Sequence, residues 1–325
     1  MYRLARLTTY TTLKSVNKSN FMVSNLGQYH EWNKLASIII GSAFDSGSIP
    51  REEDCYDPTT LATVQKGIYP NHVLLEQQLN ALVHTLESLG VTVYRPKNLS
   101  QVDQIFARDV GFVIQDVLVR SKMIEDRAKE WEGVKDLLQG VKCVTPPSDV
   151  LIEGGDVLIA GDKLYVGYSD EETISSYQTA RTNEKSLLWL QKTFPDIQVV
   201  GVQLIKDDLD VTKNVLHLDC AFMPLGLGHC IVYKEGFRTE EDYRKITADY
   251  PMEKIFHVSQ EEAILLATNL LSIDKQCIVS DKRFTRVNKW LESNGYHIHL
   301  VDYSAIGKLG GLLRCSTLPL ERQLV

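Results

Sequence analysis

Apolar residues along the chain form short strand-like runs that alternate with stretches of helical spacing. Leu35 to Ile40 is a β-rich apolar run that ends at Gly41. Further along, five leucines recur every three or four residues, at positions 75, 79, 82, 86 and 89. Gly90 then provides a natural helix stop before the apolar run 91–94. This spacing predicts a strand, an amphipathic helix and a second strand.

The same order of elements recurs in four further units, which span residues 110–144, 157–204, 215–258 and 263–301 and are followed by the segment 307–322. Helices are predicted in them at 124–139, 172–193, 239–249 and 283–293. Continuous strands are predicted over the runs Val215 to Phe222 and Ala263 to Ile273. Alternating strands and helices exclude a helical bundle and an all-β sandwich. A pattern that repeats without repeated sequence predicts one pseudo-symmetric α/β domain, with strand ends and turns converging on its axis.

Composition limits the class of protein. The 325 residues allow two ordinary domains or one large one, and 44% hydrophobic with 24% charged residues is typical of a globular chain. No apolar run approaches the roughly 20 residues that span a bilayer, so we expect no membrane partner. The net charge of −7 argues against nucleic-acid binding, which needs a basic face.

Cysteine usage and the N-terminal composition bear on location. The six cysteines lack any Cys-x-x-Cys pair and their spacing is irregular, so we expect reduced thiols and a cytoplasmic protein. Before Glu31 the chain carries Arg3, Arg6, Lys14 and Lys18 but no acidic residue. We interpret residues 1–30 as a basic N-terminal extension and 31–325 as the folded domain. The alternative for 1–30 is a mitochondrial transit peptide.

Four segments place reactive side chains beside strand ends or glycine turns: Phe106-Ala-Arg-Asp109, Ile152-Glu-Gly-Gly-Asp156, Leu216-His-Leu-Asp219 and Gly310-Gly-Leu-Leu-Arg-Cys315. Each has an ordinary structural explanation, such as a strand cap, a solvated turn or a buried histidine. His217 and Asp219 stand two apart in a predicted strand, so we expect both on one face.

Cys315 follows Arg314, and a neighbouring cation would favour its thiolate form. The alternative is an inert core cysteine. A zinc site could instead draw on His217, Cys220, His229 and Cys230. Their spacing lacks the paired knuckles of structural zinc sites, so we expect no metal.

In chain order these segments resemble the pentein superfamily of guanidine-modifying enzymes, which includes arginine deiminases, dimethylargininases and amidinotransferases. The resemblance runs from Glu31-Trp-Asn-Lys-Leu35 to residue 323. Glu153-Gly-Gly-Asp156 and Arg314-Cys-Ser-Thr-Leu-Pro-Leu320 are its most specific parts. It implies a single domain folded as a five-bladed α/β propeller, which agrees with the five units.

The resemblance also implies a role for each catalytic residue. By motif position Cys315 is the nucleophile and His217 the acid and base. Glu153 orients His217 or contacts the guanidinium. A planar, permanently charged guanidinium resists attack, so thiolate chemistry needs carboxylates that hold the substrate.

The substrate-binding residues implied are Asp109 and Asp219, which would clamp the guanidinium, and Arg181, which would hold a substrate carboxylate. The alternative for Arg181 is a surface arginine at a helix start. The His217-Leu-Asp219 motif resembles arginine deiminases and amidinotransferases, whereas the compact layout around Arg181 resembles dimethylargininases.

The expected function is a cysteine-dependent hydrolase that acts on arginine or a substituted arginine through a covalent S-amidino intermediate. The alternative is an amidinotransferase that passes the amidino group to an amine, and a minor alternative is a non-catalytic pentein binding module. We expect no cofactor, a small guanidino substrate as partner, and a homodimer as the assembly to test.

Overall fold

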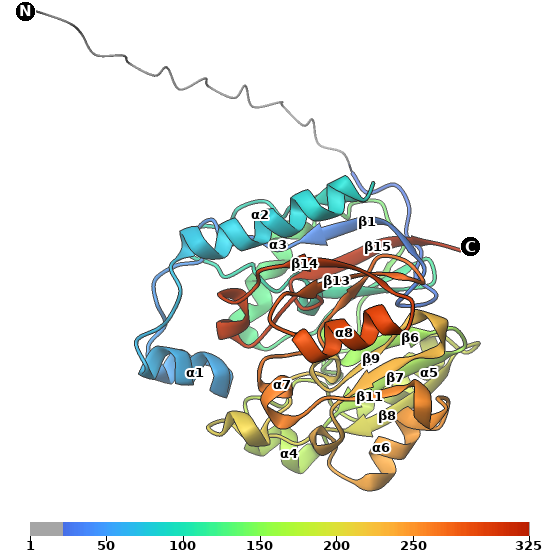
Figure 1. Cartoon of the computed structure of the whole chain (residues 1–325). Coiled ribbons are helices and arrows are strands. Elements are labelled where there is room, and N and C mark those ends of the chain that lie inside the picture. Colours follow the sequence, from blue (N-terminus) through green and yellow to red (C-terminus); the bar gives the residue numbers. More distant parts are fainter. Residues whose placement is uncertain (1–21, 325) are drawn as a thin grey trace, which may run out of the picture.

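The computed structural model describes residues 22–324, and the described chain forms five three-stranded sheets (Figure 1). Residues 1–21, which hold most of the predicted basic extension, lie outside the described residues. Residues 27, 28 and 30 form isolated β-bridges to residues 321, 115 and 160. The chain from residue 22 onward therefore packs with the domain.

Four of the sheets share one plan, in which an antiparallel hairpin is joined through a helical crossover to a third, parallel strand. The strands are, sheet by sheet, β3 (Gly111–Ile114), β4 (Val117–Arg120) and β5 (Cys143–Val144); β6 (Val157–Ala160), β7 (Lys163–Tyr168) and β8 (Gln198–Gln203); β9 (Phe222–Pro224), β10 (Cys230–Val232) and β11 (Ile255–His257); β12 (Leu271–Ser272), β13 (Cys277–Asp281) and β14 (His297–Val301). These are four blades of the five-bladed pseudo-symmetric α/β propeller that the resemblance implies and with which the repeating pattern agrees.

The remaining blade joins the two ends of the chain. β1 (Lys34–Ile40) pairs in parallel with β2 (Thr92–Tyr94) and antiparallel with β15 (Thr317–Gln323), in a register that runs from Lys34 opposite Gln323 to Ile40 opposite Thr317. Figure 1 shows the blue β1 beside the red β15. The segment 307–322, which the sequence pattern leaves outside any unit, thus completes the first blade and closes the ring.

Helices cover the blades: α1 (Pro58–Gln65), α2 (His72–Ser88), α3 (Trp131–Val134), α4 (Glu171–Ser176), α5 (Lys185–Thr193), α6 (Glu240–Thr247), α7 (Gln260–Ile264) and α8 (Thr285–Ser293). In α2 the four leucines 75, 79, 82 and 86 are buried, as their spacing predicts. Asn71 caps its first turn through Leu74 N at 2.9 Å, and Gly90 at φ +81° follows its end. Each buried leucine contributes about 1.5–3 kcal/mol to folding. Within residues 22–324 no helix has the length and apolar character to cross a membrane.

Two predicted helices are wrong in extent. The stretch 172–193 divides into α4 and α5, because the carboxylate of Asp208 accepts from the backbone N–H groups of Gln178 and Thr179, both at 3.0 Å. These bonds compete with the helical ladder and leave 177–184 irregular. The stretch 124–139 forms a 3₁₀ helix, Glu125–Glu130, that leads into the single turn of α3.

Two predicted strands are also wrong. The run 215–222 contains the 3₁₀ helix Leu218–Cys220 ahead of β9. The run 263–273 contains the end of α7 and a turn with Leu266 at φ +65° ahead of β12. His217 and Asp219 therefore do not share a strand face. Their side chains reach different partners, Glu153 and Arg314 respectively.

The first strand of each hairpin, together with β15, follows a short segment rich in polar residues. These five segments lie at residues 107–110, 153–156, 217–220, 267–270 and 314–316. Backbone bonds join them directly, as in the 3.0 Å bond from Arg108 N to the carbonyl of Cys315. Five segments far apart in sequence thus meet at one site.

Candidate active site

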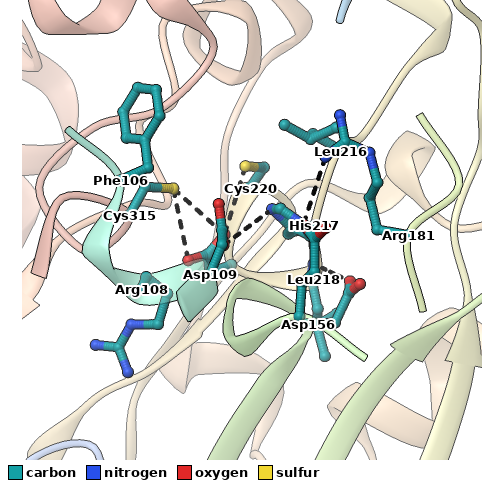
Figure 2. Close-up of polar contacts among 12 residues, drawn as sticks. Phe106, Arg108, Asp109, Asp156, Arg181, Leu216, His217, Leu218, Cys220 and Cys315 are labelled. Carbon is teal, nitrogen blue, oxygen red and sulfur yellow. Dashed lines mark hydrogen bonds and ion pairs between the residues drawn. The ribbon is translucent and has the colours of Figure 1, made fainter. Parts of the chain in front are cut away.

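A cavity of about 340 Å³ lies where these segments meet. Its lining includes Asp109, Arg127, Arg181, His217 and Cys315. Figure 2 shows the side chains of Cys315, Asp109 and His217 close together, whereas Arg108 points away from them. Four of the six residues expected to carry the chemistry therefore reach this cavity. Glu153 and Asp219 lie behind its wall, both 0% exposed.

The sulfur of Cys315 is buried among polar groups. It accepts a hydrogen bond from Asn269 Nδ2 at 3.1 Å and lies 3.7 and 3.8 Å from the carboxylate oxygens of Asp219. Arg314 donates instead to Glu31, at 3.0 and 3.2 Å, and to Asp219, at 2.9 Å. The prediction that Arg314 supports the Cys315 thiolate is therefore wrong, because two carboxylates take up its charge.

His217 is held by carboxylates on two sides. Its Nε2 lies 2.8 Å from Glu153 Oε2, and its Nδ1 lies 3.7 Å from Asp109 Oδ1. Burial alone would lower the pKa of His217, but the charges of Asp109 and Asp156 and the hydrogen bond with Glu153 raise it to about 10. A pKa of about 10 keeps the imidazole protonated at neutral pH.

Glu153 stays ionised although it is fully buried. Burial would raise its pKa, but the charge of Arg181, 3.5 Å away, and the hydrogen bond with His217 bring the pKa well below its usual range. A third cation, Arg127, lies 3.9 Å away. Glu153 therefore contacts His217 as a carboxylate, and its role, to orient His217 or to contact the guanidinium, stays a prediction.

Asp109 stands between a cation and the cavity. Its Oδ2 accepts from Arg127 Nη1 at 2.7 Å. Its other oxygen and the Nδ1 of His217 are buried, and neither makes a hydrogen bond with a described residue. Both atoms belong to residues that line the cavity.

Arg181 is buried at 3% exposure in the break between α4 and α5, so the alternative of a surface arginine is wrong. Its guanidinium donates to the carbonyls of Gln178 at 2.9 Å and Tyr56 at 3.0 Å. Its role toward a substrate carboxylate stays a prediction, as does the guanidinium clamp assigned to Asp219.

The sequence reasoning missed Arg127, Glu130 and Asn269. Arg127 makes paired bonds to Glu130 at 2.7 and 2.9 Å. Burial raises the pKa of Glu130 to about 7 despite this cation. No motif marks Arg127 or Glu130. The position of Asn269 could have indicated a role. It lies two residues before β12, just as Cys315 lies two residues before β15.

Two groups of side chains bring possible metal-ligand atoms within 4.8 Å of one another among residues 22–324: Asp219, Cys220 and Cys315, and Asp109, Glu153 and His217. Both groups belong to the site already described. Neither contains His229 or Cys230, and His229 Nδ1 lies 2.9 Å from the hydroxyl of Tyr296 instead. The structure does not assemble the zinc set considered from the sequence.

Comparisons with known proteins identify the family of this chain. The family model described as N,N dimethylarginine dimethylhydrolase, eukaryotic, matches residues 65–322. The uncharacterized protein YkgA of Bacillus subtilis is 34% identical over 75% of this chain and 79% of its own length. The L-arginine:L-lysine amidinotransferase of Pseudomonas savastanoi pv. phaseolicola is 24% identical over 91% of this chain and 94% of its own length.

Solved structures share the fold. Inosamine-phosphate amidinotransferase StrB1 from Streptomyces griseus has a TM-score of 0.73 at 19% identity and covers 92% of this chain and 97% of its own. The N-terminal domain of ArgZ, an arginine dihydrolase from the ornithine-ammonia cycle in cyanobacteria, has a TM-score of 0.72 at 21% identity, covering 89% and 98%. The chain belongs to the N,N dimethylarginine dimethylhydrolase family, within the pentein superfamily of guanidine-modifying enzymes.

Proposed function

We propose that this protein is a cysteine-dependent hydrolase that acts on the guanidino group of arginine or a methylated arginine. The observation that carries the proposal is the convergence of the Cys315 sulfur, the Asp109 carboxylate and the protonated His217 on one cavity. A nucleophile, an anion for a cationic substrate and an acid for the leaving group are the three elements that this reaction requires.

Asp109 is suited to hold a guanidinium because it already binds one. The guanidinium of Arg127 donates to its Oδ2 at 2.7 Å, which leaves Oδ1 for a substrate N–H group. A guanidinium on Oδ1 would lie beside His217 Nδ1, 3.7 Å from that oxygen. The imidazolium would then stand next to a substrate nitrogen.

The chemistry follows from these positions. The Cys315 thiolate attacks the guanidino carbon, and His217 gives its proton to the departing nitrogen, which leaves as ammonia or an amine. The resulting S-amidino thioether keeps the rest of the substrate. Neutral His217 then takes a proton from water, which attacks the same carbon and expels the thiolate. The product is a ureido compound, and no cofactor is needed.

The alternative is an amidinotransferase, favoured by the amidinotransferases among the relatives. The bond that breaks differs between the two reactions. A hydrolase breaks the carbon bond to a terminal nitrogen, so the covalent intermediate carries the amino-acid skeleton. An amidinotransferase breaks the bond to the internal nitrogen, so it releases ornithine and keeps the bare amidino group.

Acid quenching of enzyme with arginine, and separately with methylated arginine, followed by intact-mass analysis, tests the proposal. A Cys315 adduct that contains the amino-acid skeleton, together with citrulline formation, supports the hydrolase. A bare amidino adduct, with transfer to glycine or lysine, identifies the transferase. No adduct and no turnover would favour the binding module, and would agree with slow iodoacetamide labelling of Cys315.

The compartment and the assembly are further parts of the proposal. We propose a cytoplasmic enzyme, or a mitochondrial one if residues 1–30 direct import, and a homodimer as the assembly to test by sedimentation. A fusion of residues 1–30 to a fluorescent reporter distinguishes the two compartments.

A further inference from the structure

We propose that Asn269 is a positioning residue that holds the Cys315 sulfur and stabilises its thiolate before substrate binds. This inference rests on the proposed role of Cys315 as nucleophile. Asn269 Nδ2 donates to the Cys315 sulfur at 3.1 Å, and Asn269 Oδ1 accepts from the Cys315 backbone N–H at 3.1 Å. One amide therefore contacts both the side chain and the backbone of the nucleophile.

The orientation of this amide is fixed by its partners. The backbone N–H of Cys315 can only donate, so the atom that faces it must be the amide oxygen. The NH₂ group then has to face the sulfur. It also lies 3.4 Å from the carbonyl of Asp219, another acceptor. The side chain is 0% exposed, so no solvent competes for these bonds.

The electrostatics of the pocket make this donor necessary. Around the sulfur stand the carboxylate of Asp219 and the thiol of Cys220, with Asp109 and His217 on the same cavity and Arg314 bound to carboxylates. The hydrogen bond with Cys315 and burial raise the pKa of Cys220, which keeps it neutral. A thiolate beside Asp219 meets a like charge, and Asn269 is the described side chain that donates an N–H to it.

The turn that carries Asn269 is well anchored. Leu266 adopts φ +65°, and Thr268 Oγ1 donates to the carbonyl of Asp219 at 2.9 Å. A left-handed leucine costs energy that the surrounding contacts must offset. Asn269 stands two residues ahead of β12, as Asp109 stands ahead of β3 and Cys315 ahead of β15. Asn269 thus occupies in the fifth blade the position that carries site residues in other blades.

Iodoacetamide alkylation of Cys315, followed by peptide mass spectrometry from neutral to alkaline pH, tests the inference. Asn269→Asp keeps the shape but turns a carboxylate toward the sulfur, and Asn269→Ser keeps a hydroxyl donor in a smaller side chain. We expect Asn269→Asp to slow alkylation at neutral pH by about tenfold or more, with the wild-type rate restored at high pH. Asn269→Ser should slow alkylation at neutral pH by a smaller factor. The value of kcat should fall while KM stays the same, because Asn269 does not line the cavity.

Thr268→Val is the matched control, because Thr268 holds the same carbonyl of Asp219 without contacting the sulfur. The alkylation rate of Cys315 in Thr268→Val should rise with pH around the same midpoint as in the wild type. A profile of Asn269→Asp that coincides with wild type, or a rate loss of equal size at every pH, would overturn the inference. Slow alkylation of Cys315 in the wild-type enzyme itself would instead contradict the proposed function.

Discussion

Replacing Glu153 with glutamine tests the electrostatic design of the site most directly. Glu153→Gln keeps the shape of the side chain and removes the charge 2.8 Å from His217 Nε2. At an effective dielectric constant near 20, a charge pair at that distance is worth about 6 kcal/mol. Asp109 and Asp156 remain as partners of the imidazole, so the substitution removes only part of the electrostatic stabilisation of the charged ring. We expect the pKa of His217 to fall from about 10 by at least about one unit, or roughly 1.4 kcal/mol.

The assay is an NMR titration of the His217 imidazole, combined with denaturant unfolding as a function of pH. The raised pKa means that the charged imidazole stabilises the wild type fully below about 6.5 and that this stability is lost as pH rises toward about 10. In Glu153→Gln the loss still begins near 6.5, but it is complete at a lower pH because only the pKa of His217 in the folded state falls. The alkaline limb of the activity profile should move in the same direction if His217 protonates the leaving group. Removing one member of this buried network should also cost about 3–5 kcal/mol of stability at neutral pH.

Glu130→Gln is the matched control, because it changes another buried carboxylate that contacts Arg127 but not His217. Glu130→Gln should leave the pKa of His217 at its wild-type value. A titration of Glu153→Gln that overlays the wild type, or an equal shift in Glu130→Gln, would refute the conclusion that Glu153 controls the imidazole.

Three further outcomes are expected. Cys315→Ser should abolish turnover but unfold like wild type, since an alcohol is a far weaker nucleophile near neutral pH, whereas measurable turnover would contradict covalent catalysis. Asp109→Asn should raise the KM for arginine about tenfold or more, because it removes the anion at the cavity wall, and an unchanged KM would remove Asp109 from the substrate site. Arg181→Ala should impair turnover of arginine about 30-fold more than that of agmatine, which lacks the carboxylate, through loss of a contact worth about 2 kcal/mol. Equal losses on the two compounds would leave Arg181 a structural role.

The repeating pattern of the sequence was enough to predict one pseudo-symmetric α/β domain, and the resemblance to the pentein superfamily implied its five blades and the candidate site residues. Strand alternation, helical leucine spacing and glycine stops depend on local sterics and on which face is buried, both of which are written in short windows. The helix 72–88 and the hairpins of β6 with β7 and β9 with β10 follow from these signals. Cys315, His217 and Asp109 were found because their motifs stand beside strand ends.

The tertiary structure decided what each side chain touches. Arg314 is the sequence neighbour of Cys315, but its guanidinium binds Glu31, 283 positions away, instead of the sulfur. β15 pairs with β1 from the opposite end of the chain, and this pairing closes the ring. Asn269 reaches the sulfur across 46 positions. Buried ions and amides select partners by distance and desolvation in the folded state, and neither quantity is a function of a local sequence window.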